Sequence, residues 1–299
     1  MKFSVFFHKV KGYLGEHLIA TGLMNGLKDE TYLKLLYLYR KGKRLNLKNP
    51  QSYNEKLQWL KINDHNDAYT QMVDKYEAKK YVANQIGDEY IIKTISIWDR
   101  FEDIEFDKLP NRFVLKCTHD SGGVVICSDK LTLDKKETSK KLSNRMNINY
   151  YYMTREYPYK NIKPKIIAEE YLESDENGLY DYKFLCFHGK AEYVFVCTER
   201  EKKDGLRITF FDMDWKRLTF RGEDPVSEIE IAKPKNFEKM RELAEKLAKD
   251  IPTVRIDFYE NNGKIYFGEI TFFHASGFEK YEPEEGDYIL GNQLDLTRV

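Results

Sequence analysis

An excess of charge of one sign is missing from this sequence: its 299 residues include 49 basic and 49 acidic residues, so the formal net charge is zero. A protein dedicated to nucleic-acid binding would show a basic excess, which argues against that class. Cysteine is scarce, and no CxxC spacing occurs among Cys117, Cys127, Cys186 and Cys197. The cysteines therefore predict reduced thiols in the core of a cytoplasmic protein, rather than a disulfide or zinc framework.

Long apolar runs, internal repeats and low-complexity linkers are also absent. The apolar stretch at the N-terminus is broken by Lys2, His8 and Lys9, so it predicts neither a signal peptide nor a membrane span. Its apolar residues repeat with a helical period, which predicts a helix packed against the body of the protein. The alternative is a surface helix that rests on the inner face of a membrane.

What is present is enough apolar material for a substantial core. Apolar residues form 41% of the chain, with 22 Tyr and 18 Phe among them, so disorder is disfavoured. A chain of this length can form one large or two modest domains. Residues 1–65 have mostly helical patterns, while strands with helices between them dominate the remainder, residues 66–299. This order predicts an α+β architecture with a helical N-terminal region.

The segment Thr253–Thr271 carries the strongest candidate site. It has the pattern of two alternating strands joined by an Asn-Gly turn. Arg255 and Asp257 would share one face of the first strand. On the returning strand, alternation predicts a common face for Ile265, Phe267, Glu269 and Thr271.

Asp257 and Glu269 are unusual because acidic residues are depleted in strands. Like charges opposite each other repel unless a cation lies between them, and magnesium prefers carboxylate and phosphate oxygens. A two-residue Asn262-Gly263 turn would put Glu269 on the far face, so a metal pair requires a three-residue loop or a β-bulge. The alternative is a solvated hairpin with its charges in water.

A second candidate site is a strand–turn–strand segment near the middle of the chain. Arg112–Cys117 and Val124–Cys127 are predicted strands, and Ser121, Gly122 and Gly123 lie at the tip between them. The Walker GxxxxGK[ST] loop is absent. The N–H groups of the tip and the ammonium group of Lys116 could instead close on phosphate oxygens. An ordinary hairpin turn is the alternative.

Further elements are predicted on either side of this segment. A helix is expected over Met72–Ala83, with Asp74 as its cap and Lys75 in its first turn, either solvated or directed at a phosphate. The other expected elements are a strand at Tyr90–Ile97, helical structure over 130–163, a strand at Lys165–Leu172, hairpins at Asp181–Cys197 and Arg207–Phe220, and a helix at Asn236–Asp250.

Taken in order, several short segments resemble the ATP-grasp enzymes, in particular the branch similar to the teichuronopeptide-synthesis protein TupA. The resemblance covers about residue 50 to about residue 280. The segments that carry it are Asp74-Lys75, Phe113–Lys116 with His119–Gly123, Ala168–Leu172, Asp181–Lys183, and Arg255–Asp257 with Glu269–Thr271. It implies an ATP-grasp fold in which two α+β subdomains, approximately 66–167 and 168–299, clasp ATP.

The resemblance also implies a role for individual residues. Arg255 and Lys116 would serve the chemical step, and Asp257, Glu269 and Thr271 would be magnesium ligands. Many relatives have asparagine at the position of Thr271, and a hydroxyl binds magnesium more weakly, which puts a second metal in doubt. The nucleotide-binding residues would be Lys75, Lys116, Ser121, Gly122, Gly123, Glu169, Glu170, Leu172, Asp181 and Lys183, with the backbone of Glu170 and Leu172 reading adenine.

The activity implied is that of an ATP- and Mg²⁺-dependent ligase that forms an amide through an acyl phosphate. TupA-like proteins are associated with cell-surface polysaccharides such as capsule, which suggests a sugar acid as the carboxylate and an amino acid or amine as the nucleophile. Tyr150–Tyr152, Tyr157, Tyr159, Phe272 and Phe273 could supply stacking surfaces for a sugar. The alternatives are a glycan kinase, a non-catalytic sugar-binding module, and a glycosyltransferase that uses Asp212-Met213-Asp214.

Overall fold

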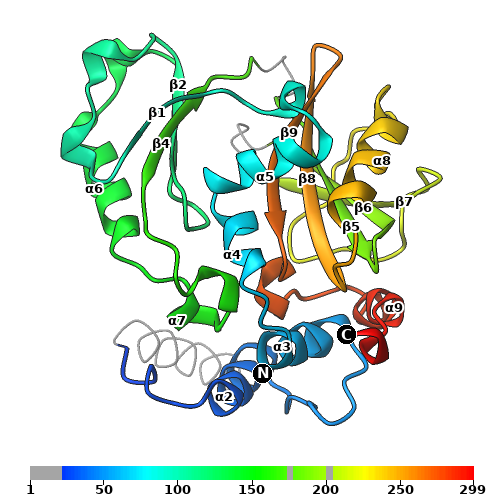
Figure 1. Cartoon of the computed structure of the whole chain (residues 1–299). Helices are drawn as coiled ribbons and strands as arrows, with labels where there is room; N and C mark the ends of the chain where they lie inside the picture. Colours follow the sequence, from blue (N-terminus) through cyan, green and yellow to red (C-terminus); the bar gives the residue numbers. More distant parts are fainter. Residues whose placement is uncertain (1–21, 174–177, 200–204) are drawn as a thin grey trace, which may run out of the picture.

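The computed structural model describes residues 22–173, 178–199 and 205–299. Two antiparallel sheets stand side by side with helices between and below them, which confirms the predicted α+β architecture (Figure 1). The first sheet has four strands in the order β1 (Thr94–Trp98), β4 (Ile166–Glu170), β2 (Phe113–Cys117) and β3 (Val124–Cys127). The second has five, in the order β7 (Arg207–Asp212), β6 (Lys190–Thr198), β5 (Asp181–Phe187), β8 (Thr253–Asn261) and β9 (Lys264–Thr271).

Each sheet packs one face on its own hydrophobic core. Helix α8 (Phe237–Leu247) lies on the second sheet through an apolar stripe that includes Phe237 and Leu243, as its heptad-like pattern predicts. Helix α6 (Lys135–Met146) lies against the first sheet through Leu142. The opposite faces of β5, β8 and β9 are therefore left for polar residues, and these faces look toward the first sheet (Figure 1).

The remaining helices lie at one end of the two sheets and between them. They are α2 (Asp29–Lys41), α3 (Tyr53–Asn63), α4 (Ala68–Val73), α5 (Glu77–Ile86), α7 (Tyr151–Thr154) and α9 (Glu285–Gln293). Helix α3 is capped at its start by Ser52, whose side chain accepts a hydrogen bond from Glu55 N and forms a capping box. Asn54 donates to both carboxylate oxygens of Asp287, which fastens α9 onto α3.

Three predicted elements differ in the structure. The helix expected over Met72–Ala83 is two helices, because the Asp74 side chain accepts from Tyr76 N and Glu77 N to start α5; Lys75 therefore lies in the link between helices. The strand expected at Tyr90–Ile97 begins only at Thr94, after a 3₁₀ turn.

The hairpin expected over Arg207–Phe220 has only its first strand, and the return is an isolated bridge from Phe211 to Arg217. Trp215 turns its ring onto Phe211, with centroids 4.4 Å apart, instead of extending the chain. The region 130–163 contains α6, α7 and two 3₁₀ turns, as expected in outline. The N-terminal segment expected to be helical lies mostly outside the described residues, in 1–21. Over the described ranges no helix is long and apolar enough to cross a bilayer.

The hairpin of β8 and β9 contains a β-bulge, which sets how the two strands pair. Asn262 and Gly263 both have positive φ and form a two-residue turn, so Asn261 pairs with Lys264. Phe258 pairs with Phe267, yet Ile256 pairs with Ile270, so one residue, Asp257, faces two on β9. To bring Asp257 and Glu269 to one face, the sequence requires either a three-residue loop or a β-bulge. The structure has the β-bulge.

The bulge changes which side chains of β9 share a face. Ile265, Phe267 and Ile270 are buried in the core, whereas Glu269 and Thr271 lie on the other face with Asp257. The prediction that Ile265, Phe267, Glu269 and Thr271 share a face is wrong, because strict alternation fails at an inserted residue. Gly268 permits the close approach: an added Cβ would lie 3.2 Å from Asp257 O.

Candidate functional site

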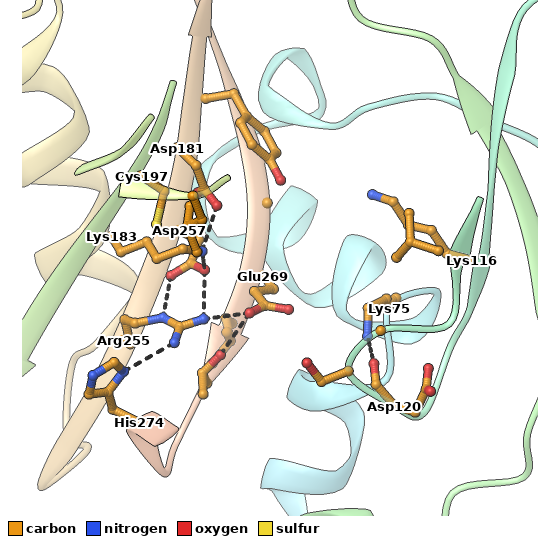
Figure 2. Close-up of a pocket in the computed structure, with 18 of the residues that line it drawn as sticks. Lys75, Lys116, Asp120, Asp181, Lys183, Cys197, Arg255, Asp257, Glu269 and His274 are labelled. Atoms are coloured by element: carbon orange, nitrogen blue, oxygen red, sulfur yellow. Dashed lines mark hydrogen bonds and ion pairs between the residues drawn. The ribbon is translucent and has the colours of Figure 1, made fainter. Parts of the chain in front are cut away.

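A cavity of about 940 Å³ lies between the two sheets and receives polar side chains from both. One wall comes from β5, β8 and β9, and the facing wall from β2, β4, the link before α5 and the loop between β2 and β3. Figure 2 shows Asp181, Lys183, Arg255, Asp257 and Glu269 on one side and Lys75 and Lys116 across from them. Two predicted candidate sites far apart in the sequence thus form one site.

Arg255 joins the two acidic residues of the hairpin. Its Nε donates to Asp257 Oδ1 at 2.8 Å, and its Nη2 donates to Asp257 Oδ2 at 2.8 Å and to Glu269 Oε1 at 2.5 Å. Thr271 Oγ1 donates to the same Glu269 oxygen at 3.1 Å. The guanidinium of Arg255 thus lies between the two carboxylates. Its positive charge offsets the repulsion that Asp257 and Glu269 would otherwise exert on each other.

Lys183 is a second buried cation beside Asp257. It forms ion pairs with Asp257 and, at 2.7 Å, with Asp181 Oδ2. Burial would lower the pKa of Lys183, but the two carboxylates outweigh it and the pKa is raised. Burial would likewise raise the pKa of Glu269, but Arg255 and Lys183 lower it, so this carboxylate stays ionised. Asp257 is the most buried member of this charged network, with only 1% of the residue accessible, whereas the Glu269 side chain is 38% exposed.

His274 extends this network and was not found from the sequence. Arg255 Nη1 donates to its Nδ1 at 3.3 Å, which assigns the ring proton to Nε2, 3.8 Å from Glu279 Oε2. Burial and the neighbouring cations hold the pKa of His274 well below its usual range, so the ring is neutral. A single histidine after two phenylalanines gives no sequence signal for this contact, which depends on the turn that follows β9.

The facing wall has its own buried carboxylate. Glu169, on β4, forms ion pairs at 2.6 Å with Lys116 on β2 and with Lys79 on α5. Lys79 also donates to Ile92 O and Thr94 Oγ1, so it is held in place. The side chain of Glu169 therefore positions Lys116 at the cavity, a function that sequence reasoning missed along with Lys79.

The loop between β2 and β3 is held to the rest of the wall by two cations. Lys75 Nζ donates to Asp120 O, and its backbone N donates to Thr118 O at 2.9 Å. Arg145, on α6, forms a 2.6 Å ion pair with Asp120 and donates to Ser121 O. Lys75 and the loop thus lie together, as the prediction of a common phosphate site requires.

The end of β4 provides the third part of the cavity. Glu170 N donates to Lys93 O at 3.0 Å, so this N–H is used within the sheet. Glu170 and Leu172 both line the cavity next to Asp181. The segment predicted to read adenine through its backbone is therefore at the edge of the cavity.

The structure brings nearly all predicted site residues to this one cavity. Those that line it are Lys75, Lys116, Ser121, Gly122, Glu169, Glu170, Leu172, Asp181, Lys183, Arg255, Asp257, Glu269 and Thr271. Gly123 is the exception: a Cβ there would lie 2.9 Å from the Cys117 side chain, so this glycine permits packing of the loop onto β2. The roles assigned to these residues stay predictions.

Oxygen ligands suitable for Mg²⁺ are present, although among the described residues no cluster of three or more His, Cys, Asp or Glu could hold a metal. Asp257 and Glu269 each place an oxygen on the same Arg255 nitrogen. Mg²⁺ is usually bound by one or two carboxylates together with substrate phosphates. The pair fits such a site, provided that Arg255 and Lys183 share the Asp257 oxygens with the ion.

Other candidate residues have structural partners. Asp212 Oδ1 accepts from Asp214 N and Lys216 N, so Asp212-Met213-Asp214 forms a turn, and neither acid lines the cavity. His188, in the turn between β5 and β6, accepts from Asp295 N at 3.0 Å. The four cysteines are buried, and none of them forms a disulfide among the described residues.

Comparisons with known proteins give one family and several distant structures. No curated protein matches the chain. Among solved structures, the D-alanine–D-alanine ligase of Bacillus anthracis in complex with ATP is 16% identical, with a TM-score of 0.39, over 68% of this chain and 54% of that one. The corresponding enzyme of Helicobacter pylori is 14% identical, with a TM-score of 0.40, over 75% and 61%. The chain thus spans little more than half the length of these proteins.

An ATP-grasp protein of the RimK type from Sphaerobacter thermophilus is 11% identical, with a TM-score of 0.40, over 75% of this chain and 67% of that one. The comparison with protein families covers a larger part of the chain. The sequence model of the TupA-like ATP-grasp family matches residues 55–295, which include every segment that forms the cavity walls described above. The chain belongs to the TupA-like ATP-grasp family.

Proposed function

We propose that this protein is an ATP- and Mg²⁺-dependent ligase that joins a carboxylate to an amine through an acyl phosphate. The observation that carries the proposal is a single cavity in which two lysines face a buried Arg–Asp–Glu network. A carboxylate is a poor acyl donor in water, so its activation requires charge neutralisation and exclusion of water. Membership of an ATP-grasp family supports ATP as the phosphoryl donor.

The nucleotide would lie along the wall of the first sheet. Lys75 and Lys116 would contact its phosphates, because ammonium groups are strong donors to phosphate oxygens. Glu170 O and Leu172 N would contact adenine, since the N–H of Glu170 is already used by Lys93. Asp181, held by Lys183 at 2.7 Å, would accept from the ribose hydroxyls.

On the opposite wall, Asp257 and Glu269 would hold Mg²⁺, with Thr271 beside them as a weak hydroxyl ligand. The ion would supply neutralisation of the triphosphate charge. Arg255 keeps its guanidinium at the same place through Asp257 and His274. It would stabilise the negative charge that develops when the carboxylate is phosphorylated, as a preorganised donor in a water-poor site.

The aromatic residues predicted to face a sugar separate into two groups. Tyr150, Tyr159 and Phe273 line the cavity. Phe272 instead stacks on Tyr69, with centroids 4.0 Å apart, and Tyr157 stacks on His65. The first group supports a sugar acid of a surface polysaccharide as the carboxylate, because aromatic faces pack against the C–H faces of sugars.

Nucleotide preference is the most direct test. We expect ATP with Mg²⁺ to raise the melting temperature by several degrees at saturation, since a ligand that binds only the folded state stabilises it. ATP without the metal should give a smaller shift, and UDP-sugars should give none. A shift with a UDP-sugar alone would favour a glycosyltransferase and contradict the ligase.

Lys116 should matter for affinity rather than folding. In the variant Lys116→Met, Glu169 keeps its ion pair with Lys79, so the wall should stay folded. We expect the dissociation constant for ATP, measured by calorimetry, to rise about tenfold or more, because a charged hydrogen bond to phosphate is lost. Lys93→Met, an exposed lysine 3.6 Å from Glu170, is the control. If the two variants changed the dissociation constant for ATP equally, the proposed contact between Lys116 and the phosphates would be wrong.

Product analysis by mass spectrometry separates the reaction types. A mixture of ATP, Mg²⁺, candidate sugar acids and candidate amines should yield an amide together with ADP and phosphate. Phosphate found on the sugar hydroxyl instead would identify a kinase that uses the same nucleotide site.

A further inference from the structure

A part of the cavity is not explained by nucleotide or metal binding. It lies where α7 and the residues after it meet the 3₁₀ segment His274–Gly277, beside α2 and α3 (Figure 1). Tyr150, Glu156, Tyr159 and Ser276 line it. Burial and the charges of Glu156 and Glu269 raise the pKa of Tyr159. Arg255 and Glu269 line the same cavity, so this part adjoins the Arg255 network.

Glu156 is a buried carboxylate with hydrogen bonds but without an ion pair. Only 3% of the residue is exposed. Its Oε1 accepts from Ser276 Oγ at 2.5 Å and from Thr154 Oγ1 at 3.0 Å. Within the part of the chain that the structure describes, no lysine, arginine or histidine reaches it within 4.0 Å, and its Oε2 has no hydrogen bond.

The nearest compensating charge is Lys61, which is fully buried. Lys61 Nζ donates at 2.8 Å to Thr154 O and to Ser276 O, the main chains of the residues whose hydroxyls donate to Glu156. Lys61 thus fixes the carboxylate indirectly and leaves Oε2 of this cavity-lining residue without a hydrogen bond from any described residue. Burial raises the pKa of Glu156, and Lys61 and the two hydroxyl donors lower it only in part.

A buried carboxylate is unfavourable unless it is paired, and a cavity beside it allows the partner to be a ligand. We propose that Glu156 binds the ammonium group of the amine substrate, with the rings of Tyr150 and Tyr159 beside it. The inference rests on the proposed ligase function and adds the site of its second substrate. The amine could come from a free amino acid or from an amino sugar, which share this group.

The surroundings favour an ammonium ion over a neutral hydroxyl. The rings of Tyr150 and Tyr159 are tilted by 57°, with centroids 5.2 Å apart, and aromatic faces attract cations through their quadrupole. A hydroxyl would satisfy Oε2 by hydrogen bonding but would leave the charge of Glu156 uncompensated. The position also suits the reaction, because the amine must approach a carboxyl group held near Arg255.

The test is calorimetric titration of the full chain with Mg²⁺ and a non-hydrolysable ATP analogue present. The probes are a panel of free amino acids, D-glucosamine, and the N-acetylated form of each. We expect at least one amine to bind and its N-acetylated form not to bind. In Glu156→Gln the affinity for that amine should fall about tenfold or more, while the affinity for the ATP analogue stays within about twofold.

Two controls keep the outcome decisive. Glu156→Asp retains the charge and should recover part of the amine affinity, which a purely structural role would not predict. Glu245→Gln makes the same chemical change at an ion-paired residue of α8 outside the cavity and should leave amine binding unchanged.

The inference is overturned if no amine of the panel binds while the ATP analogue does, or if Glu156→Gln binds the amine as tightly as the wild type. Preferential binding of a neutral sugar at this position would also overturn it. Failure of the ATP analogue to bind would instead count against the proposed function, so the two failures are distinguishable.

Discussion

Replacing Glu269, a proposed magnesium ligand, by glutamine should lower ATP turnover about a thousandfold, because loss of the ligand charge would remove about 4 kcal/mol of transition-state stabilisation. The side chain is 38% exposed, and glutamine retains its shape and an oxygen for Thr271. The fold should therefore persist, with a melting temperature within a few degrees of wild type. The measurement is ADP release at saturating Mg²⁺, together with circular dichroism.

A matched variant on the same hairpin is Glu260→Gln. Glu260 lies near the turn and accepts hydrogen bonds from Asn236, outside the cavity. It should lose little turnover. If Glu269→Gln kept the activity of this control, Glu269 would not be a metal ligand, and the proposal of a magnesium site on β8 and β9 would fail.

The largest effect on stability is expected for Lys183→Met. Lys183 is buried between Asp181 and Asp257, so its removal leaves two buried carboxylates with one cation fewer. Breaking a buried ion pair from one side costs about 3 kcal/mol or more of unfolding free energy. Urea denaturation should show this loss. Lys190→Met, which breaks an exposed 3.1 Å pair with Glu245, should cost less than about 1 kcal/mol.

The loss in Lys183→Met should also depend on pH. Burial raises the pKa of Asp257, and removal of Lys183 should raise it further. A carboxyl group with a raised pKa in the folded state favours folding at low pH, and this contribution is lost as the pH rises through that pKa. The stability deficit of the variant should therefore be smaller at about pH 5 than at about pH 8. A deficit that is equal or larger at the lower pH would contradict this account.

Residues missed from the sequence share one property: each acts on a site residue from another element. Lys79 holds Glu169 from α5, His274 contacts Arg255 from the turn after β9, and Arg145 contacts the β2–β3 loop from α6. None has a distinctive sequence pattern, because the contact depends on packing between segments distant in sequence.

Local patterns in the sequence were sufficient for the two candidate sites, most strand positions and the α+β class. Alternation identified β2, β5 and β8, and the amphipathic stripe identified α8. These features depend on neighbouring residues, whose geometry the backbone fixes. The order of motifs was also sufficient to indicate the family.

Only the tertiary structure decided how the charges are paired and which residues share a face. Alternation along β9 predicted the wrong partners for Glu269, because an inserted residue reverses the faces and its position is set by packing across the sheet. Similarly, charge repulsion between Asp257 and Glu269 predicted a cation between them, and the structure places there the guanidinium of Arg255 from the same hairpin. Burial and long-range contacts determine such pairings, and no local pattern encodes them.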